Sequence, residues 1–490
     1  MMNWKKLQNG SDIRGVALEG IEGENVNFTP EVVETIAKAF VRWIIDATGN
    51  QHPAIAIGAD CRLSGKDVRA AFINGATSMG ADMMDCGLAS TPAMFMTTVS
   101  EQTKASASVM VTASHLPFNR NGLKFFTPEG GLDSKDIAAI LDIAEKGDFE
   151  YEGTQGKCSD LDFMTVYSKH LADYIRNGVK ADDFLHPLSG MHIIVDAGNG
   201  NGGFFEKILQ SLGADTQGSQ FLAPDGCFPN HIPNPENAEA MASVCDAVKR
   251  SHADLGIIFD TDVDRSAIVD HQGCPINRNS LIALISTVIL QEHPGSTIVT
   301  DSVTSDGLAE FILSKGGKHH RFRRGYKNVI NEGIRLNANG EECWLAIETS
   351  GHAALRENYF LDDGAYLAAK LIIYAALLNK EGKHLHDVIS SLRQPKESKE
   401  IRIKITDPDF KAYGSKVLED MKTAFAGVPG WSLVSPNHEG LRVSCGNPDE
   451  EGWLLLRMSL HDPVLPLNIE SNVNGGVAVI EGKLRSIGLL

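Results

Sequence analysis

The sequence lacks the features that tie a protein to a membrane or to a nucleic acid. Its most apolar long run, residues 366–378, is too short to span a bilayer and contains Lys370. Residues 1–10 lack the apolar core of a signal peptide. Acidic residues outnumber basic ones, 63 to 45, and a net charge of −18 opposes non-specific binding to nucleic acids or anionic lipids. We therefore expect a soluble, cytoplasmic protein in which local cations hold any anionic ligand.

Cysteine is scattered, and low-complexity sequence is absent. None of the eight cysteines forms a CxxC pair, which disfavours a zinc or dithiol redox site. Free thiols in a reducing compartment are the simplest account. With 42% hydrophobic and 22% charged residues, the composition is that of a folded globular protein. A chain of 490 residues is long enough for roughly three or four domains, each with its own core.

Apolar strands alternate with helical patterns over most of the chain. A capped helical pattern at 30–43 precedes a strand at 54–57, and strand, polar loop and helix then recur. This alternation predicts α/β layers, whereas the region after about residue 386 has the hairpins of an α+β domain. Polar stretches mark the boundaries. We predict domains at 1–160, 161–270, 271–385 and 386–490.

The loop that follows the apolar run 107–111 contains the first candidate site residue. Its sequence is TASHLP at 112–117, continuing to NGLK at 121–124. The run reads as a buried strand, and loops that leave the ends of such strands commonly carry active sites. Ser114 is therefore a candidate phosphoryl carrier. In isolation, a turn whose Ser and His bond to the local backbone is the favoured alternative.

A second loop concentrates three carboxylates. The apolar run 255–259 leads into DTDVDR at 260–265, and alternate residues of an extended segment share a face. Oxygen ligands of this kind suit a hard cation such as Mg²⁺. An EF-hand fits poorly, because its sixth position is Arg265 and its twelfth is His271. A metal site therefore ranks above a solvated acidic turn.

Five further segments are informative only in combination. The sequence ETSGH at 348–352 offers groups that suit a polyol sugar, while RFRRGYK at 321–327 and RMSLHDP at 457–463 could each bind phosphate. A solvated turn and a charged hairpin end explain the last two equally well. GSDIRG at 10–15 reads as a surface loop when taken alone. The glycine-rich turn at 196–200 favours tight packing over phosphate binding, because it matches no nucleotide fingerprint.

Together these segments resemble the α-D-phosphohexomutase family, which includes phosphoglucomutase, phosphomannomutase and phosphoglucosamine mutase. The family carries loops of the form TASHNPxxxNGxK, DxDxDR, GExSGH and RPSGTEP in that order. This chain has corresponding loops at 112–124, 260–265, 346–352 and 457–463. Four loops in the correct order are far more specific than any one of them.

The resemblance implies a fold and an activity. The fold is three similar α/β domains with mixed sheets and a smaller C-terminal α+β (TBP-like) domain around a central cleft. The activity is interconversion of hexose 1-phosphate and hexose 6-phosphate, of glucose or mannose, through a phosphoserine enzyme and a 1,6-bisphosphate. The implied cofactors are Mg²⁺ and glucose 1,6-bisphosphate or a related activator. The implied partner is a small phosphosugar, with no nucleic acid and no membrane, and the oligomeric state is left open.

The resemblance also assigns roles to residues of this chain. Ser114 is the residue that becomes phosphorylated, and it is expected to hold the metal together with the three aspartates of the second loop. The full expectation is catalytic Ser114, Arg14, Lys124, Arg265 and His352; metal-binding Ser114, Asp260, Asp262 and Asp264; and substrate-binding Lys327, Glu348, Ser350, Arg457, Ser459 and His461.

Departures from the family pattern leave alternatives open. Leu116 replaces the usual Asn, Ala346 departs from the sugar loop, and residues 460–462 replace Gly-Thr-Glu of the phosphate loop. Loss of that glycine removes access to positive φ and predicts a differently shaped loop. The alternatives are a phosphoglucosamine mutase, a non-catalytic sugar-phosphate binding protein, and a haloacid-dehalogenase-type phosphatase with Asp260 as nucleophile. Asp264 at the fifth position of the phosphatase motif argues against the last.

Overall fold

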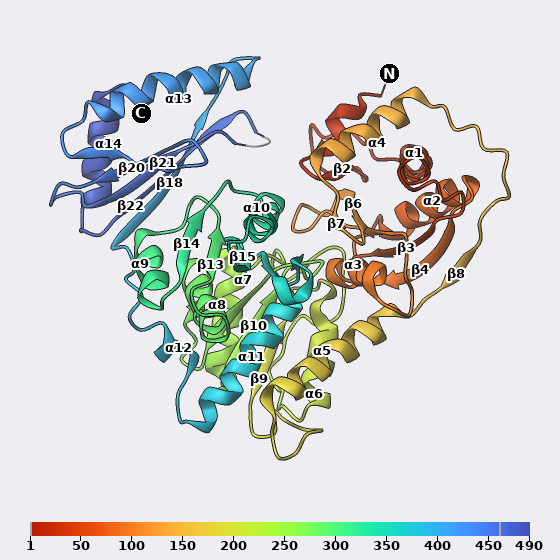
Figure 1. The fold of residues 1–490 in the computed structure, drawn as a ribbon, viewed down its shortest axis with the longest axis horizontal. Coiled ribbons are helices and arrows are strands. Elements are labelled where there is room, and N and C mark those ends of the chain that lie inside the picture. The colour runs from red at the N-terminus through yellow and green to blue at the C-terminus, as the bar shows by residue number, and fades with distance from the viewer. Residues whose placement is uncertain (1, 460–461) are drawn as a thin grey trace. The chain divides into compact units, whose positions relative to one another are not determined.

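The computed structural model describes residues 2–459 and 462–490, so the predicted site residue His461 lies outside the described residues. Packing divides the chain into two compact units. The first comprises Met1–Asn277 and Ser350–Asp387, and the second comprises Arg278–Thr349 and Val388–Leu490 (Figure 1). The four predicted domain boundaries stay predictions. Among the described residues, no helix has both the length and the apolar character needed to cross a bilayer.

The first unit begins with a mixed sheet in the order β1-β2-β6-β5-β3-β4-β8, with β7 paired to β6. Strand β3 is parallel to β4 and β5, and β8 is parallel to β4, whereas β6 is antiparallel to β5 and β2. The bounds are η1 Trp4–Leu7, β1 Gln8–Asn9, β2 Asp12–Val16, β3 Ala54–Ala59, β4 Asp82–Leu88, β5 Ala107–Val111, β6 Arg120–Thr127, β7 Gly130–Gly131 and β8 Cys158–Asp160.

Helices α1 (Pro30–Thr48), α2 (Gly65–Ser78) and α4 (Ser134–Lys146) pack their apolar faces on this sheet, where Phe40 and Phe125 have ring centroids 4.5 Å apart (Figure 1). Helix α3 (Thr91–Val99) packs against β5 and β6. The side chain of Thr29 accepts a hydrogen bond from the Val32 amide and starts α1, as its sequence predicts. The helix ends at Gly49, in the left-handed conformation that favours glycine.

The second sheet of the first unit has the order β12-β11-β10-β9, with β9 parallel to β10 and β10 antiparallel to β11. Its strands are β9 Ile193–Asp196, β10 Leu255–Phe259, β11 Ser266–Asp270 and β12 Pro275–Ile276. The helices of this part of the unit are α5 Phe163–Val179, η2 Asn201–Gly203, α6 Phe204–Ser211, α7 Ala238–Ser251, η3 Arg356–Asn358, α11 Gly364–Lys380 and α12 Leu385–Val388. Strands β16 Ala353–Leu355 and β17 Leu361–Asp362 form an antiparallel pair. Helices α5 and α11 pack together through Tyr174 and Tyr366, whose rings stack 4.3 Å apart.

The second unit contains a parallel and an antiparallel set of strands. Strands β14 (Lys318–Arg321), β13 (Thr297–Thr300) and β15 (Cys343–Ile347) are parallel and accompany α8 (Arg278–Glu292), α9 (Asp306–Ser314) and α10 (Tyr326–Ala338). The C-terminal strands follow the antiparallel order β18-β22-β21-β20-β19, and α13 (Phe410–Ala426) and α14 (Gly476–Ser486) cover them with one apolar core (Figure 1). Their bounds are β18 Glu397–Lys404, β19 Trp431–Leu433, β20 Leu441–Cys445, β21 Gly452–Leu456 and β22 Val464–Ser471. The predicted change to an α+β pattern is confirmed.

Candidate active site

Ser114 lies where β5 leaves the first sheet, as predicted. Its side chain is 4% exposed, and its backbone φ of 51° is in the left-handed region that residues other than glycine rarely adopt. The Ser114 hydroxyl donates to Asp260 Oδ2 at 3.2 Å and accepts from Arg265 Nη2 at 3.0 Å. The structure therefore brings together a hydroxyl, a carboxylate and a guanidinium from two separate loops.

His115 is a site residue that the sequence analysis did not single out, although it lies inside the serine motif. Its Nδ1 accepts a hydrogen bond from Arg265 Nη2 at 2.6 Å. Burial lowers the pKa of His115 to about 2, helped by the nearby positive charges of Arg265, Arg14 and His352. The ring is therefore neutral, and it helps to orient the arginine that contacts the serine.

Arg14 and Lys124 lie on the paired strands β2 and β6. Arg14 is opposite Gly122 and forms an ion pair with Asp12 at 2.7 Å, so its segment is a strand and not the surface loop that the sequence alone favours. A Cβ on Gly122 would lie 2.4 Å from the Ile13 carbonyl oxygen, so only glycine fits between the strands. Lys124 extends from β6 to the acidic loop.

The acidic loop is a tight turn between β10 and β11. Strand β10 ends at Phe259, and the Asp260 amide bonds to the Arg265 carbonyl across the turn. Val263 has a φ of 67°, which is strained for a β-branched residue. The predicted aspartates do converge, with candidate ligand atoms within 4.8 Å of one another. The extended-strand geometry proposed for them is wrong, because a strained turn brings them together.

The glycine-rich turn after β9 packs behind this acidic loop. A Cβ on Gly200 would lie 2.8 Å from the Thr261 Cα, and the Asn201 amide donates to the Thr261 carbonyl at 2.8 Å. These contacts support the packing role expected for the turn. They also fix the backbone between the first two aspartates.

The acidic loop carries more negative charge than its neighbours balance. Lys124 Nζ donates to Asp262 Oδ2 at 2.9 Å and also pairs with Asp264, while Arg265 pairs with Asp260 at 3.0 Å. Three cations, Lys124, Arg265 and the more distant His352, thus face four buried carboxylates, because His352 also pairs with Asp362. Burial and the Asp264 charge raise the pKa of Asp260 well above its usual range. For Asp264, burial opposes ionisation, but Lys124, His352 and Arg265 together hold its pKa low.

Two carboxylate oxygens in this loop are candidate metal ligands. Oδ1 of Asp262 and Oδ1 of Asp264 are buried and have no hydrogen-bond partner. Buried polar atoms without partners are uncommon, and each costs about 1–3 kcal/mol unless it is satisfied. Oxygen donors combined with a deficit of positive charge fit a hard divalent cation.

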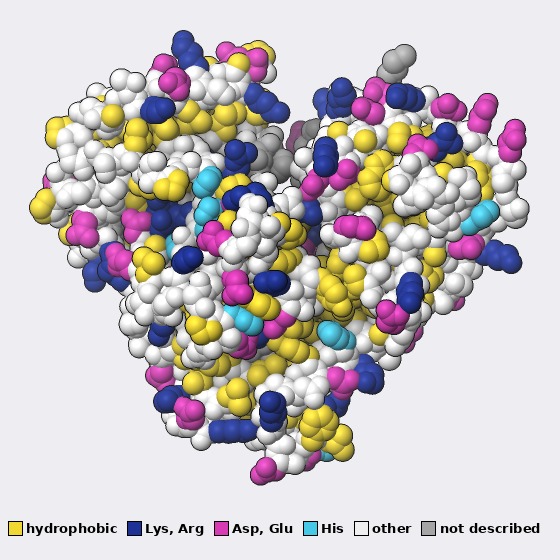
Figure 2. Space-filling model, in the orientation of Figure 1, with side chains coloured by type: hydrophobic (Ala, Val, Ile, Leu, Met, Phe, Trp, Pro, Cys, Tyr) yellow, Lys and Arg dark blue, Asp and Glu magenta, His cyan; other side chains and the backbone are white. Residues whose placement is uncertain are grey.

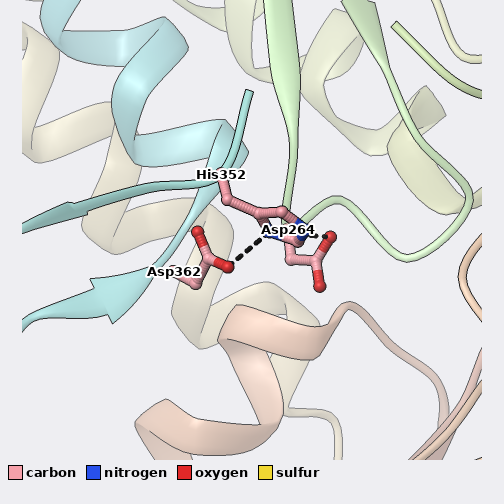
Figure 3. A group of neighbouring side chains, drawn as sticks. All are labelled: Asp264, His352 and Asp362. Atoms are coloured by element: carbon pink, nitrogen blue, oxygen red, sulfur yellow. Dashed lines mark ion pairs between the residues drawn. The ribbon is translucent and has the colours of Figure 1, made fainter. Parts of the chain in front are cut away.

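His352 lies between two carboxylates of the first unit (Figure 3). Its Nδ1 forms an ion pair with Asp362 and is 3.9 Å from Asp264 Oδ1. Although burial lowers the pKa of His352, the charges of Asp362 and Asp264 raise it to about 9. Asp362 was missed because nothing in its local sequence marks it. Thr91, which donates to Asp262 Oδ2 at 2.5 Å, was missed for the same reason.

Sugar-loop residue Glu348 belongs to the second unit, whereas Ser350, also buried, belongs to the first. Glu348 Oε1 accepts a hydrogen bond from the Gly325 amide at 2.6 Å. Lys327 follows in the first turn of α10. Within the second unit, the sugar loop and the cationic loop are therefore in contact.

Not every cation of the segment 321–327 is a site residue. Arg321 bonds to the Ser305 carbonyl at 2.8 Å and to Asp306 Oδ1 at 3.0 Å, which is a structural role. Arg323 donates to the His438 carbonyl at 3.1 Å. The backbone amide of Arg324 donates a hydrogen bond to Glu439 Oε2 at 3.1 Å, beside the candidate phosphate loop. Within the cationic segment, Arg321 therefore stabilises the fold, whereas Arg324 lies at the candidate binding surface.

Arg457 follows β21 and is 7% exposed, and its buried Nε has no hydrogen-bond partner. Burial lowers the pKa of Arg457, and the nearby Glu439 carboxylate opposes that effect. Ser459, two residues on, donates its amide to the Val464 carbonyl at 3.1 Å. A buried guanidinium with an unused donor is a candidate anion-binding group. On the face shown in Figure 2, basic and acidic side chains are interspersed, so such local groups matter more than a broad field.

Comparisons with known proteins agree with this geometry. Family models for domains I, II and III of phosphoglucomutase/phosphomannomutase, described as alpha/beta/alpha, match residues 5–151, 167–273 and 277–395. A phosphoglucomutase of Neisseria gonorrhoeae is 28% identical over 480 residues, covering 97% of this chain and 95% of its own. A phosphomannomutase/phosphoglucomutase of Pseudomonas aeruginosa is 28% identical over 448 residues, covering 90% and 89%.

A crystal structure of a phosphoglucomutase/phosphomannomutase family protein from Burkholderia thailandensis superposes with a TM-score of 0.80 at 25% identity, covering 99% of this chain and 97% of that one. The fold and the successive domain matches define an α-D-phosphohexomutase, a class of isomerases that are mutases. The chain belongs to the phosphoglucomutase/phosphomannomutase family. The predicted family, fold class and enzyme class are confirmed.

Proposed function

We propose that the chain interconverts the 1-phosphate and 6-phosphate of glucose and mannose through phosphorylated Ser114 and a hexose 1,6-bisphosphate. The observation that supports this most strongly is the buried Ser114 hydroxyl between Asp260 Oδ2 and Arg265 Nη2. Phosphoryl transfer spreads negative charge over the transferring oxygens, so fixed cations beside the acceptor stabilise the transition state. Arg265 supplies such a cation and is held by the carboxylate beside the serine.

The step proposed for Ser114 is reversible. Phosphoserine transfers its phosphoryl group to the free hydroxyl of a hexose 1-phosphate, which loses its proton, and the Ser114 oxygen leaves. The 1,6-bisphosphate then returns its other phosphoryl group to Ser114 and leaves as hexose 6-phosphate. Arg14, Lys124 and His352 are proposed to move protons or orient the reacting groups. Burial of Ser114 excludes water, which would hydrolyse the phosphoenzyme.

Asp260, Asp262 and Asp264 are proposed to hold Mg²⁺, together with an oxygen of phosphorylated Ser114. The buried Oδ1 atoms of Asp262 and Asp264, which have no hydrogen-bond partner, support this assignment. When bound, the ion would neutralise charge on the phosphoryl oxygens. Lys124, which pairs with two of these carboxylates, keeps a positive charge at the same loop.

Binding of the phosphosugar substrate is assigned to Glu348, Ser350, Lys327, Arg457 and Ser459, with His461 retained on sequence grounds. Arg457 is the proposed contact to the substrate phosphate because its buried Nε has no hydrogen-bond partner. Glucose 1,6-bisphosphate or a related hexose bisphosphate is the proposed activator, since it would rephosphorylate Ser114. A phosphoglucosamine mutase is the runner-up within the family.

The phosphatase alternative requires Asp260 to attack a phosphoryl group. Both oxygens of Asp260 are instead engaged, Oδ1 by the Arg265 amide and Oδ2 by the Arg265 side chain and Ser114. The non-catalytic alternative requires loss of the catalytic arrangement. Ser114, Arg265 and the three aspartates retain it.

A coupled assay tests the proposal. Purified protein with Mg²⁺ and a trace of glucose 1,6-bisphosphate is offered the 1-phosphates of glucose, mannose and glucosamine separately. Ser114→Ala is the test variant, and Ser106→Ala, a partly exposed serine just before β5, is the matched control. We expect isomerisation of the glucose and mannose phosphates that Ser114→Ala abolishes and Ser106→Ala retains.

Each other result of the assay overturns a stated part of the proposal. Turnover confined to the glucosamine phosphate would replace the proposed substrate with the runner-up. Phosphate release that survives Ser114→Ala would support a hydrolase. Binding without turnover would support the non-catalytic alternative.

A further inference from the structure

Arg62 is a buried cation that the proposed chemistry does not use. It lies in the loop between β3 and α2 and donates to backbone carbonyls of the serine loop. Nη2 bonds to the carbonyl of Ser114 and, at 2.7 Å, to that of Leu116. Nη1 bonds to the carbonyls of Pro117 at 2.8 Å and Arg120 at 3.1 Å. One guanidinium therefore gathers four carbonyls of the loop that carries Ser114.

A second connection holds the other side of the Ser114 peptide unit. The Ser114 amide donates to Thr112 Oγ1 at 2.9 Å, and Thr112 Oγ1 donates to Asp60 Oδ2 at 2.6 Å. Asp60 forms an ion pair with Arg62 at 3.2 Å, with both side chains fully buried, and its Oδ1 accepts from the Arg62 amide at 3.0 Å. The amide and the carbonyl of Ser114 are thus fixed by one buried ion pair.

The loop that carries Arg62 is itself packed from behind. The Arg62 guanidinium lies over the ring of Phe228, 5.5 Å from its centroid. A Cβ on Gly226 would lie 2.5 Å from the Cys61 carbonyl oxygen, so the two loops touch at backbone distance. The Arg62 side chain is therefore enclosed and fully buried where it meets the serine loop.

Ser114 needs such fixation because its backbone is strained. A φ of 51° for a residue other than glycine costs of order 1 kcal/mol and persists only where surrounding contacts determine it. This conformation is the one in which the hydroxyl reaches Asp260 and Arg265. Without the Arg62 bonds, the peptide could relax to an ordinary backbone region and carry the hydroxyl away.

We infer that Arg62 is a positioning residue that holds Ser114 in its left-handed conformation, through the forked geometry of its guanidinium. This inference rests on the proposed role of Ser114 as phosphoryl carrier. Arg62 touches no reacting atom and acts through four carbonyls. A point charge would serve poorly, since a lysine ammonium cannot present the planar fork that spans them.

The test compares Arg62→Lys and Arg62→Met with Arg69→Met. Arg69 is the matched control. It lies on helix α2 and forms a partly buried ion pair with Asp85 of strand β4 at 3.1 Å. Because Arg62→Met leaves Asp60 without its ion-pair partner, the double variant Asp60→Asn/Arg62→Met provides a neutral background. The readouts are kcat and KM separately, the ³¹P resonance of the phosphoenzyme, and amide hydrogen exchange over residues 112–120.

We expect both Arg62 variants to lose about 10²-fold in kcat, the cost of a misplaced reacting group, with KM unchanged. Their phosphoserine resonance broadens and their loop amides exchange faster, whereas Arg69→Met matches the wild type. Wild-type kcat in Arg62→Lys would overturn the inference in favour of a charge effect. Wild-type kcat and exchange in the double variant would overturn it outright.

Failure of the proposed function gives a different pattern. A wild-type protein that neither isomerises sugar phosphates nor forms phosphoserine would refute the phosphoryl carrier role. Hydrogen exchange still decides the inference in that case. Faster exchange over residues 112–120 in the Arg62 variants supports the positioning role, and unchanged exchange overturns it.

Discussion

Two clusters of buried charge, one in each unit, differ in how completely their polar atoms are paired. The serine cluster of the first unit consists of Ser114, Lys124, Arg265 and the three aspartates of the acidic loop. The arginine cluster of the second unit consists of Arg442, Trp453, Glu470 and Asp306. The serine cluster contains two buried carboxylate oxygens, Oδ1 of Asp262 and Oδ1 of Asp264, that have no hydrogen-bond partner. In the arginine cluster, Arg442, Trp453 and Glu470 have no buried polar atom without a partner.

The arginine cluster consists of contacts that stabilise the fold. The Arg442 guanidinium lies 3.8 Å from the Trp453 ring centroid and donates to the Ser302 carbonyl at 2.9 Å and to Asp306 Oδ1 at 2.8 Å. Trp453 Nε1 donates to Glu470 Oε2 at 2.8 Å. A fully satisfied polar network stabilises a fold, whereas a partly satisfied one costs stability and is retained for function. The comparison therefore separates residues for chemistry from residues for stability.

The largest expected effect is on activity in the serine cluster. Asp264→Asn removes one of the three carboxylates, and we expect kcat/KM to fall by about 10³-fold, the scale of losing a key electrostatic group. The protein should still fold but with a lower free energy of unfolding, because Lys124, His352 and Arg265 hold the pKa of Asp264 low and the substitution removes the charge that they stabilise. Steady-state kinetics with a titration of Mg²⁺, alongside a urea unfolding curve, measure the two effects.

Asp246→Asn is the control for that variant, since Asp246 is exposed on α7. Asp246→Asn should unfold at the wild-type urea concentration, and the activity of Asp264→Asn is compared with it under conditions in which both variants are folded. If Asp264→Asn kept full activity with an unchanged dependence on Mg²⁺, the acidic loop would not be the metal site. The serine cluster would then not be distinguished from the arginine cluster by a role in activity.

In the arginine cluster, we expect a loss of stability without a loss of activity. Arg442→Met breaks the contacts to Trp453 and Asp306, and we expect a loss of about 3 kcal/mol in the free energy of unfolding. The kcat of the protein that remains folded should not change. Urea unfolding followed by fluorescence measures the loss. Arg335→Met, at an ion pair whose arginine side chain is 55% exposed, should cost far less. Equal losses in the two variants would contradict the account.

A smaller effect is expected from the titration of Glu470. Burial raises the pKa of Glu470 to about 7, and the negative charge of Asp306 adds to the shift. The hydrogen bond from Trp453 and the positive charges of Arg442 and Arg278 oppose it. Between its ordinary pKa of 4.5 and 7, the folded protein keeps a proton that the unfolded chain loses. The free energy of unfolding therefore falls as pH rises through this window, by at most about 3 kcal/mol, and is level above it. Glu470→Gln should lack this slope. A variant with the wild-type slope would assign the effect to other groups.

The sequence predicts the serine cluster well because its residues lie on loops directly after apolar strands. The bounds of the apolar runs 107–111 and 255–259 agree residue for residue with strands β5 and β10. Ser114, Asp260 and Arg265 are identified by short motifs whose chemistry is local. The geometry that joins them is harder to predict from the sequence, because valine rarely adopts the positive φ that Val263 has in the acidic loop.

Residues that act over long sequence distances were not predictable in the same way. Arg62 lies in a polar loop that the sequence shows as a simple strand-to-helix connection, yet it bonds to carbonyls more than fifty residues away. Strand β6 was not expected, because Asn121-Gly122 reads as a turn. Its glycine is required instead by close contact with β2. The contacts decide these roles, and local propensity does not reveal them.

The central claim is that Ser114 carries the phosphoryl group, and isotope labelling tests it most directly. The wild type, Ser114→Ala and Ser106→Ala are incubated with ³²P-labelled glucose 1,6-bisphosphate and Mg²⁺, and the labelled peptide is identified by mass spectrometry. The account predicts an acid-stable label on the peptide that contains Ser114, absent only from Ser114→Ala. A hydroxylamine-sensitive label on Asp260, or a label that persists in Ser114→Ala, would contradict it.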